Sequence, residues 1–186
     1  MSKRSALIEN LKKEIGTVEE PKNSNITKFN DWYYDPEALK ASERFVHLAK
    51  WYHSLVLKKD YLTLGRTFAW CGSFVAYMNH FSGIYLDPEL HLSLGYVPAA
   101  QNYLKAKGYE TKTPQPGDIV VFDWNNDGFE EHIGFFLRFE GNKVITIEGN
   151  TSPDSKGSQS NGGMVCQKIR KMKQIEGFYN VIDDER

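Results

Sequence analysis

The sequence predicts a single α+β domain, with helices in its N-terminal part and an antiparallel sheet in its C-terminal part. Up to residue 108, apolar residues recur every three or four positions, as they do on one face of a helix. From residue 118 onward, short β-branched and aromatic runs are separated by Gly, Asn and Asp, the pattern of strands joined by turns. Neither a repeat nor a shift in composition divides the 186 residues, so we expect one domain.

Two helices are expected within residues 1–67, the lead-in to the rest of the domain. The first runs from Ser5 to Gly16, where glycine ends it. Its apolar side carries Leu7, Ile8, Leu11 and Ile15. After a polar stretch, Asp35-Pro36 offers an N-cap followed by proline at the first helical position. This signal predicts a second helix over residues 36–58.

Residues 68–186 are expected to form the catalytic core, which begins with two more helices. Apolar residues keep the helical spacing from Phe68 to Gly83. Another helix is predicted from Pro98 to Lys107, closed by Gly108. We expect residues 84–97, between these helices, to form a loop.

Four strands are expected after residue 118. The pair Gly141-Asn142 predicts a two-residue hairpin between the second and the third. The Ser- and Gly-rich stretch 151–163 predicts a long surface loop before the fourth. The predicted strands are 119–122, 133–139, 144–147 and 164–169.

Composition excludes several classes of protein. Lys and Arg number 23 against 24 Asp and Glu, a net charge of -1 that disfavours a nucleic-acid binder. No apolar run is long enough to span a membrane, and the first 30 residues lack the layout of a secretory signal, so we expect synthesis in the cytoplasm. Two cysteines, Cys71 and Cys166, are too few for a disulfide framework.

Cys71 is the candidate nucleophile. It lies at the start of the helix predicted from residue 68, where the aligned backbone dipoles favour a thiolate over a thiol. The small residues Gly72 and Ser73 leave room beside the sulfur, and the free N–H groups of a first helical turn can donate to an oxyanion. Cys166 lies within a strand run and is interpreted as a packed thiol.

A thiol nucleophile needs a base, and the base needs an acceptor that orients it. Of the five histidines, His132 begins a predicted strand, whereas His47, His53, His80 and His91 lie on helices or loops. The hairpin brings Glu148 and Asn150 back beside His132, and their spacing of two places both on one side of an extended chain. From the hairpin alone, either Glu148 or Asn150 could hold the imidazole.

Four ordered motifs resemble those of the CHAP family of cysteine amidohydrolases, relatives of the NlpC/P60 enzymes. The likeness covers most of residues 14–151 and includes a lead-in from Ile15 to Tyr33. The motifs are Trp70-Cys71-Gly72-Ser73-Phe74-Val75, Pro116-Gly117-Asp118-Ile119-Val120-Val121-Phe122, Glu131-His132-Ile133-Gly134 and Ile147-Glu148-Gly149-Asn150. The long stretch 36–58 departs from many relatives, which pass quickly from the lead-in to the cysteine.

The resemblance implies a papain-like α+β fold and hydrolysis of an amide bond in peptidoglycan, without a required cofactor. It makes Cys71 the nucleophile, His132 the general base and then acid, Glu148 the residue that orients the imidazole, and Asn150 a further polar residue of the site. The bond would be the one cut by an N-acetylmuramoyl-L-alanine amidase, or a peptide bond of the stem or cross-link.

Weaker signals concern a metal and a substrate groove. Asp123, Asn125, Asp127 and Glu131 are spaced like the start of a calcium loop, but Gly134 occupies the twelfth position, where such a loop has a bidentate Glu, so calcium binding is not expected. The alternative is a polar turn that aims His132. Trp70 and Trp124 could line a groove, because sugars and peptides lie well on flat aromatic faces; core packing would explain them equally.

Two biological settings fit this chemistry. The protein would be an antibacterial effector neutralised by an immunity protein, or a phage-type lysin that reaches the cell wall at lysis. Two other functions stay open: an amidase acting on a small peptide conjugate, and a wall-binding module without turnover. No nucleic-acid or membrane partner is expected.

Overall fold

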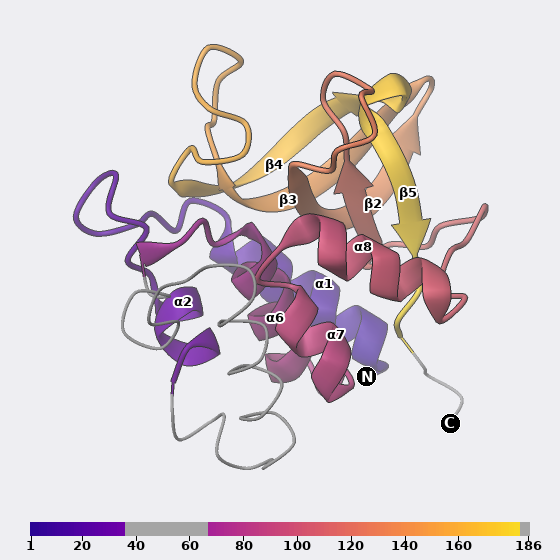
Figure 1. Ribbon diagram of the computed structural model, residues 1–186, viewed down its shortest axis with the longest axis horizontal. Coiled ribbons are helices and arrows are strands. Elements are labelled where there is room, and N and C mark those ends of the chain that lie inside the picture. The colour runs from indigo at the N-terminus through magenta and orange to yellow at the C-terminus, as the bar shows by residue number, and fades with distance from the viewer. Residues whose placement is uncertain (36–66, 183–186) are drawn as a thin grey trace.

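The computed structural model describes residues 1–35 and 67–182 of the chain. The helix predicted over residues 36–58, together with His47 and His53, lies outside the described residues. The described part contains helices packed against a five-stranded antiparallel sheet, which is the α+β arrangement expected from the sequence. In Figure 1 the helices gather on one side of the sheet.

The first helix, α1, spans Lys3–Glu14, with the hydroxyl of Ser2 accepting a hydrogen bond from the N–H of Ser5. Leu7 and Leu11 face inward and have no exposed surface, whereas Ile15 lies beyond the helix and is exposed. A second short helix, α2 (Lys28–Tyr33), was not predicted. The side chain of Thr27 caps this helix by accepting a hydrogen bond from the N–H of Asn30. Because Thr27 follows a polar segment, its role as an N-cap does not stand out in the sequence.

Helix α6 (Cys71–Phe81) confirms the helix expected after Phe68, and α8 (Val97–Ala106) confirms the one expected before Gly108. The loop expected over residues 84–97 contains another helix, α7 (Pro88–Ser93). The carboxylate of Asp87 caps it and Pro88 occupies its first turn. Asp87-Pro88 is the same kind of start signal as Asp35-Pro36, but the helix that it begins is only six residues long.

The strand order in the sheet is β4-β3-β2-β1-β5. Gly141 has a positive φ of 59°, as the first turn residue of the β2–β3 hairpin requires, and Glu140 pairs with Lys143 across it. Strand β5 and the short 3-10 helix η3 (Met172–Gln174) were not predicted; Glu176 and Gly177 interrupt the apolar run of β5. The strands are β1 (Ile119–Phe122), β2 (His132–Glu140), β3 (Lys143–Thr151), β4 (Met164–Lys171) and β5 (Ile175–Tyr179).

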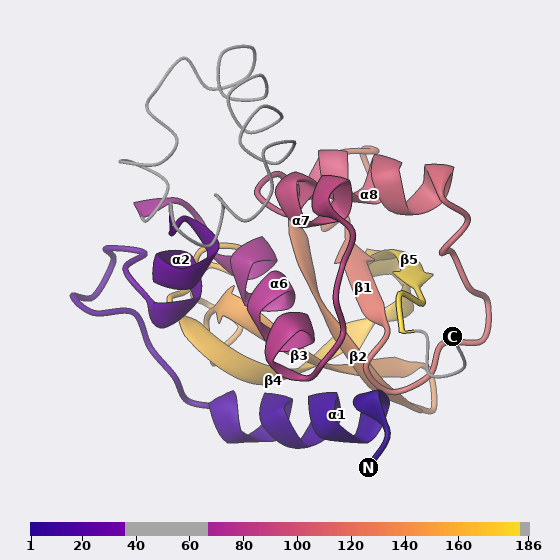
Figure 2. The same ribbon diagram turned by 90° about the horizontal axis from the view of Figure 1, so that it is seen from below.

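The main core lies between the helices and the sheet (Figure 2). Leu7 near the N-terminus and Ile182 near the C-terminus both belong to it, so residues far apart in the sequence share one interior. A second, smaller cluster covers the other face of the sheet with Val120, Phe122, Phe136, Val144 and Phe178.

Irregular segments pair with both outer strands of the sheet. Thr17 and Gly16 exchange backbone hydrogen bonds with Val165 of β4 at 2.8 and 2.9 Å. On the opposite side, the N–H of Thr111 donates to the carbonyl of Phe178 in β5, at 2.9 Å. Residues 16–19 and 109–111 therefore extend the sheet beyond its five named strands.

Candidate active site

Cys71 is the first residue of α6 and is buried, with 5 % of its surface exposed. The chain beside it fits closely: a Cβ at Gly72 would lie 1.7 Å from the carbonyl oxygen of Leu94. Only glycine allows this approach, which brings the segment after α7 against the start of α6. The hydroxyl of Ser73 donates to Asn30 at 2.6 Å and so fixes the same helical turn to α2.

His132 begins β2 and is fully buried. Its Nε2 lies 3.2 Å from Oε2 of Glu148 on the neighbouring strand β3. Neither ring nitrogen makes an aligned hydrogen bond within the described residues, so the contact with Glu148 is an ion pair of oblique geometry. The rings of Phe122 and Trp124 lie 5.6 and 5.7 Å from the imidazole and enclose it.

Glu148 reaches His132 across the position of Gly134. The register that pairs Phe135 with Ile147 places Gly134, not His132, opposite Glu148. A Cβ at residue 134 would lie 2.8 Å from Cγ of Glu148, so the glycine leaves the space through which the carboxylate passes. The hairpin thus brings Glu148 to the imidazole as expected, within the register slack that a bulge near Phe136 introduces.

The pKa values of His132 and Glu148 are shifted in opposite directions. Burial alone would lower the pKa of His132, but the thiol of Cys71 and the carboxylate of Glu148 raise it from 6.5 to about 9. Burial alone would raise the pKa of Glu148, but Arg170 and His132 lower it from 4.5 to about 2. The arrangement therefore favours a protonated imidazole and an ionised carboxylate beside Cys71.

Arg170 is a residue of the site that sequence reasoning missed. Its Nε donates to Oε1 of Glu148 at 2.8 Å, and its Nη2 contacts Oε2. The strand predicted over residues 164–169 stopped one position short of it. The signal was present in the alternation of Cys166, Lys168 and Arg170, which places all three on one face of β4.

Within the described residues, Asn150 makes no hydrogen bond to the imidazole. Its Nδ2 donates to Asn161 at 3.0 Å and its Oδ1 accepts from the N–H of Gly163 at 3.1 Å. Of the two acceptors that the hairpin left open, Glu148 is therefore the one at His132. Asn150 instead holds the end of the loop between β3 and β4 through these hydrogen bonds. Its own backbone has a positive φ of 60°.

Only one of the two tryptophans considered for a groove has exposed surface. Trp70 is wholly buried, stacked on Phe29 with ring centroids 5.4 Å apart, and cannot line a groove. Trp124 is partly exposed, stacks on Phe122 at 4.9 Å, and donates from Nε1 to Ser160 at 2.7 Å.

Two exposed aromatic residues not singled out from the sequence lie next to each other. The ring centroids of Tyr96 and Phe129 are 6.4 Å apart, and their exposed fractions are 41 % and 50 %. Tyr96 follows Leu94, whose carbonyl lies against Gly72, and Phe129 is three residues before His132. We call this exposed pair the aromatic rim.

The residues spaced like a calcium loop form a polar turn. Burial alone would raise the pKa of Asp123, but N–H donors from Gly128, Asn126 and Asp127 lower it. The carboxylate of Glu131 accepts from the N–H of Trp124 at 2.8 Å. These two carboxylates are thus directed at the backbone of their own loop. In the part of the chain that is described, no three His, Cys, Asp or Glu side chains form a group that could hold a metal ion.

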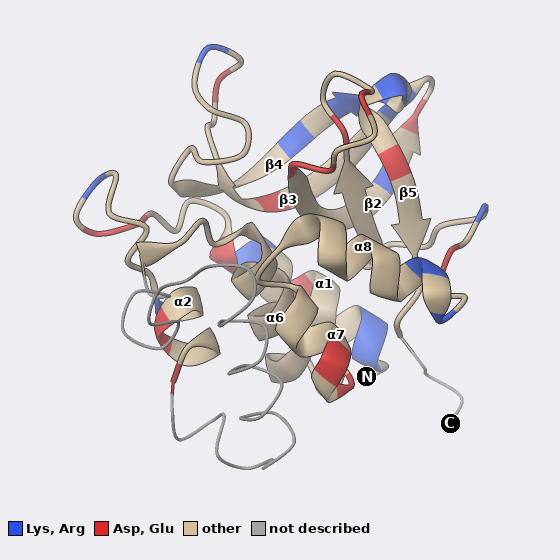
Figure 3. Cartoon of the chain, in the orientation of Figure 1, with Lys and Arg blue, Asp and Glu red and all other residues tan. Residues whose placement is uncertain are grey.

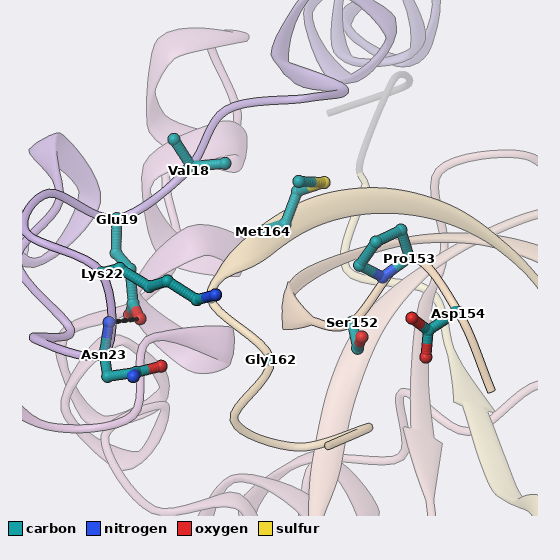
Figure 4. Close-up of a pocket in the computed structure, with 10 residues that line it drawn as sticks. Val18, Glu19, Lys22, Asn23, Ser152, Pro153, Asp154, Gly162 and Met164 are labelled. Atoms are coloured by element: carbon teal, nitrogen blue, oxygen red, sulfur yellow. Dashed lines mark hydrogen bonds between the residues drawn. The ribbon is translucent and has the colours of Figure 1, made fainter. Parts of the chain in front are cut away.

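A cavity of about 440 Å³ lies between the lead-in and the loop that follows β3 (Figure 4). The buried carboxylate of Glu19 forms part of its wall and accepts from the N–H of Asn23 at 2.5 Å. The side chain of Lys22 extends across it. Its lining residues, Val18, Glu19, Lys22, Asn23, Ser152, Pro153, Asp154, Gly162, Gly163 and Met164, do not include Cys71, His132 or Glu148.

The other two described histidines pack against aromatic rings. His80 lies in the last turn of α6, and its ring centroid is 4.9 Å from that of Trp32. His91 on α7 stacks on Tyr33 at 4.8 Å. Burial and the nearby His80 lower the pKa of His91 to about 4, so it stays neutral near pH 7.

Comparison with protein families identifies a match over much of the catalytic core. Residues 63–150 match the family model of the CHAP domain, a cysteine- and histidine-dependent amidohydrolase or peptidase domain associated with peptidoglycan hydrolases. The matched stretch includes Cys71, His132, Glu148 and Asn150. A comparison with curated proteins finds no significant match. Among the described residues, no helix has the length and apolar character needed to cross a membrane.

Proposed function

Because residues 63–150 of this chain are a CHAP domain, we propose that the protein hydrolyses an amide bond of peptidoglycan with Cys71 as the nucleophile. The observation that carries this proposal is the buried imidazole of His132 between the thiol of Cys71 and the carboxylate of Glu148. A nucleophile, a base and an orienting acceptor are the three parts that acyl transfer by cysteine needs.

In the first half of the cycle, the Cys71 thiolate attacks the amide carbonyl carbon and forms a C–S bond. The N–H groups of the first turn of α6, which have no partner within the helix, stabilise the developing oxyanion. His132, protonated at the outset, gives its proton to the leaving amine as the C–N bond breaks. The product of this half is a thioester on Cys71.

In the second half, neutral His132 takes a proton from water, and the resulting hydroxide attacks the thioester. The acid product leaves, the thiolate reforms and His132 is again protonated. Glu148 stays ionised throughout and orients the imidazole, because its low pKa makes it a poor proton acceptor. Asn150 supports the site indirectly by holding residues 161 and 163.

The test is mass spectrometry of purified peptidoglycan digested with the wild-type protein and with Cys71→Ala. New fragments should depend on Cys71, and their masses name the bond that is cut. Cys166→Ala is the matched control, because Cys166 is the other buried thiol and is directed at the carbonyl of Thr151. Equal fragment yields from wild type and Cys71→Ala would refute the proposal.

The proposal includes action on the bacterial wall either as an antibacterial effector or as a phage-type lysin. An effector requires a specific inhibitor in the cell that makes it, and a lysin does not. Co-expression with neighbouring reading frames distinguishes the two: a frame whose product blocks peptidoglycan cleavage identifies an effector. A small peptide conjugate, offered in the same digestion assay, tests the remaining substrate class.

A further inference from the structure

Arg170 is a buried arginine that contacts the candidate catalytic group directly, through Glu148. It lies on β4 with 5 % of its surface exposed, and it forms a two-pronged contact with the carboxylate of Glu148. A guanidinium and a carboxylate match in this geometry, so the pair fixes the orientation of the carboxylate as well as its charge. Residue 170 lies outside the stretch that matches the CHAP domain.

Every nitrogen of this guanidinium is engaged. Besides Glu148, Nη1 donates to Gln159 at 2.8 Å and Nη2 donates to Thr151 at 3.3 Å. One face of the group covers the Trp124 ring, with Cζ 4.7 Å from the ring centroid. These contacts fix the position of the guanidinium, and the fixed guanidinium in turn restricts the orientation of the Glu148 carboxylate.

The two oxygens of Glu148 have different partners. Oε1 accepts from Nε of Arg170 and from the hydroxyl of Thr146, at 2.8 and 2.6 Å. Oε2 contacts Nη2 of Arg170 and is also the atom 3.2 Å from Nε2 of His132. The oxygen that faces the imidazole is thus held by the guanidinium itself.

We propose that Arg170 is a positioning residue of this active site: it keeps Glu148 ionised and keeps Oε2 directed at His132. The inference rests on the proposed function for its catalytic meaning, but its geometry does not depend on the substrate. Without the guanidinium, the cation still in contact with the buried carboxylate of Glu148 would be the imidazolium of His132, with Lys168 acting only from a distance. Glu148 would then bind a proton more readily. The imidazole would lose its fixed acceptor.

Other titratable groups face Glu148 and belong in the interpretation of any pH effect. Lys168 and Cys166 lie on the same face of β4 as Arg170, and His132 faces Glu148 from β2. Lys168 is occupied by the carbonyl of Ser152 and does not contact the carboxylate through a hydrogen bond within the described residues. Arg170 is therefore the cation that holds Glu148 from β4.

The test compares Arg170→Met and Arg170→Lys by the rate at which iodoacetamide alkylates Cys71 as a function of pH. In Arg170→Met, the acidic limb of the profile should move to higher pH, because Glu148 then takes up a proton more readily. Arg170→Lys keeps the positive charge but loses the two-pronged contact with Glu148, so the acidic limb of its profile should move less. For peptidoglycan cleavage, we expect kcat to fall roughly 100-fold in Arg170→Met and roughly tenfold in Arg170→Lys, with KM little changed.

A purely structural role would lower the folded fraction without moving the limb, so circular dichroism melts accompany each variant. Arg138→Met is the matched control: Arg138 is exposed on β2, contacts Glu140, and should leave the profile unchanged. An unshifted limb in a folded Arg170→Met protein overturns the inference. If Arg170→Met does not fold, an unshifted limb in Arg170→Lys overturns it.

The alkylation assay needs no cell-wall substrate, so the two proposals fail separately. Alkylation that depends on Arg170, without any peptidoglycan fragments, would refute the proposed function and leave the role of Arg170 standing. Fragments that depend on Cys71, with alkylation insensitive to Arg170, would do the reverse.

Discussion

At the scale of single residues, the site depends on a missing side chain as much as on those present. Gly134 lies opposite Glu148, and any Cβ there would be 2.8 Å from the Cγ of Glu148. The methylene of Glu148 would have to move, and its carboxylate with it. The absence of a side chain at Gly134 therefore allows Glu148 to contact His132.

We expect Gly134→Ala to displace Glu148 from His132 while the backbone of β2 remains compatible with alanine. The free energy of unfolding should fall by about 1–3 kcal/mol, as is usual when a packed interior is overfilled. Cleavage should fall by much more than the loss of folded protein explains. Gly141→Ala is the comparison variant, because its positive φ makes alanine straining there too, but at the exposed hairpin and not opposite Glu148. Wild-type kcat in Gly134→Ala would contradict the prediction.

The pH dependence follows from His132. Its pKa is raised to about 9, so the imidazolium is retained through neutral pH and is lost as the pH rises through 9. We expect kcat/KM to fall above about pH 9 in a steady-state profile. A group whose pKa is raised on folding stabilises the fold fully below its ordinary pKa of 6.5, and that contribution also disappears as the pH passes 9. An alkaline limb near pH 7 would show that Cys71 and Glu148 do not hold the proton on His132.

At the scale of elements, the sequence predicted those with a strong local signal. Helix α6 has continuous apolar spacing, and the β2–β3 hairpin has its Gly-Asn turn, so both could be located before the structure. Helix α7 is six residues long and β5 contains Gly177, and segments so short give too few positions for a period to emerge.

The residues of the candidate site likewise fall into those that a local sequence pattern can place and one that it cannot. Cys71, His132 and Glu148 could be predicted because a helix start and a hairpin fix their places along the chain. Arg170 could not be assigned to Glu148 in advance, since their contact depends on the β3–β4 register, and a loop of twelve residues separates those strands. Local pattern does not fix the register across so long a connection.

Two segments between elements form the aromatic rim at Tyr96 and Phe129, and we expect this rim to contact substrate. Replacing either residue by alanine should raise KM roughly threefold to tenfold, the equivalent of an aromatic contact of about 0.5–1.5 kcal/mol, with kcat unchanged. Tyr85→Ala is the control, because Tyr85 is 78 % exposed and lies beyond the end of α6 that is remote from Cys71. An unchanged KM in the Tyr96→Ala, Phe129→Ala double variant would remove this rim from the binding surface.

At the scale of the whole molecule, the matched stretch 63–150 contains only part of the core. It lacks α1, whose Leu7 and Leu11 are fully buried in the main core, and it lacks strands β4 and β5. It also lacks Arg4, which donates to the buried carboxylate of Asp118 at 2.8 Å. Residues from both ends of the chain complete the interior around the candidate site.

We therefore expect a protein consisting of residues 63–150 to show no cooperative thermal transition by circular dichroism. The full chain, measured under the same conditions, should unfold in one step, because its halves share one core. A cooperative melt of the short protein would show that α1, β4 and β5 are dispensable for folding.

The pairing of residues 16–19 with β4 and of 109–111 with β5 has a consequence for colloidal behaviour. An unpaired outer strand is a template on which another polypeptide can add, the usual start of β-mediated aggregation. Here the chain covers part of each outer strand with its own irregular segments. Along the rest of β4, Lys and Arg recur (Figure 3), and exposed Lys171 adds charge repulsion between copies. The protein thus limits the addition of a second copy to its sheet without closing that sheet into a barrel.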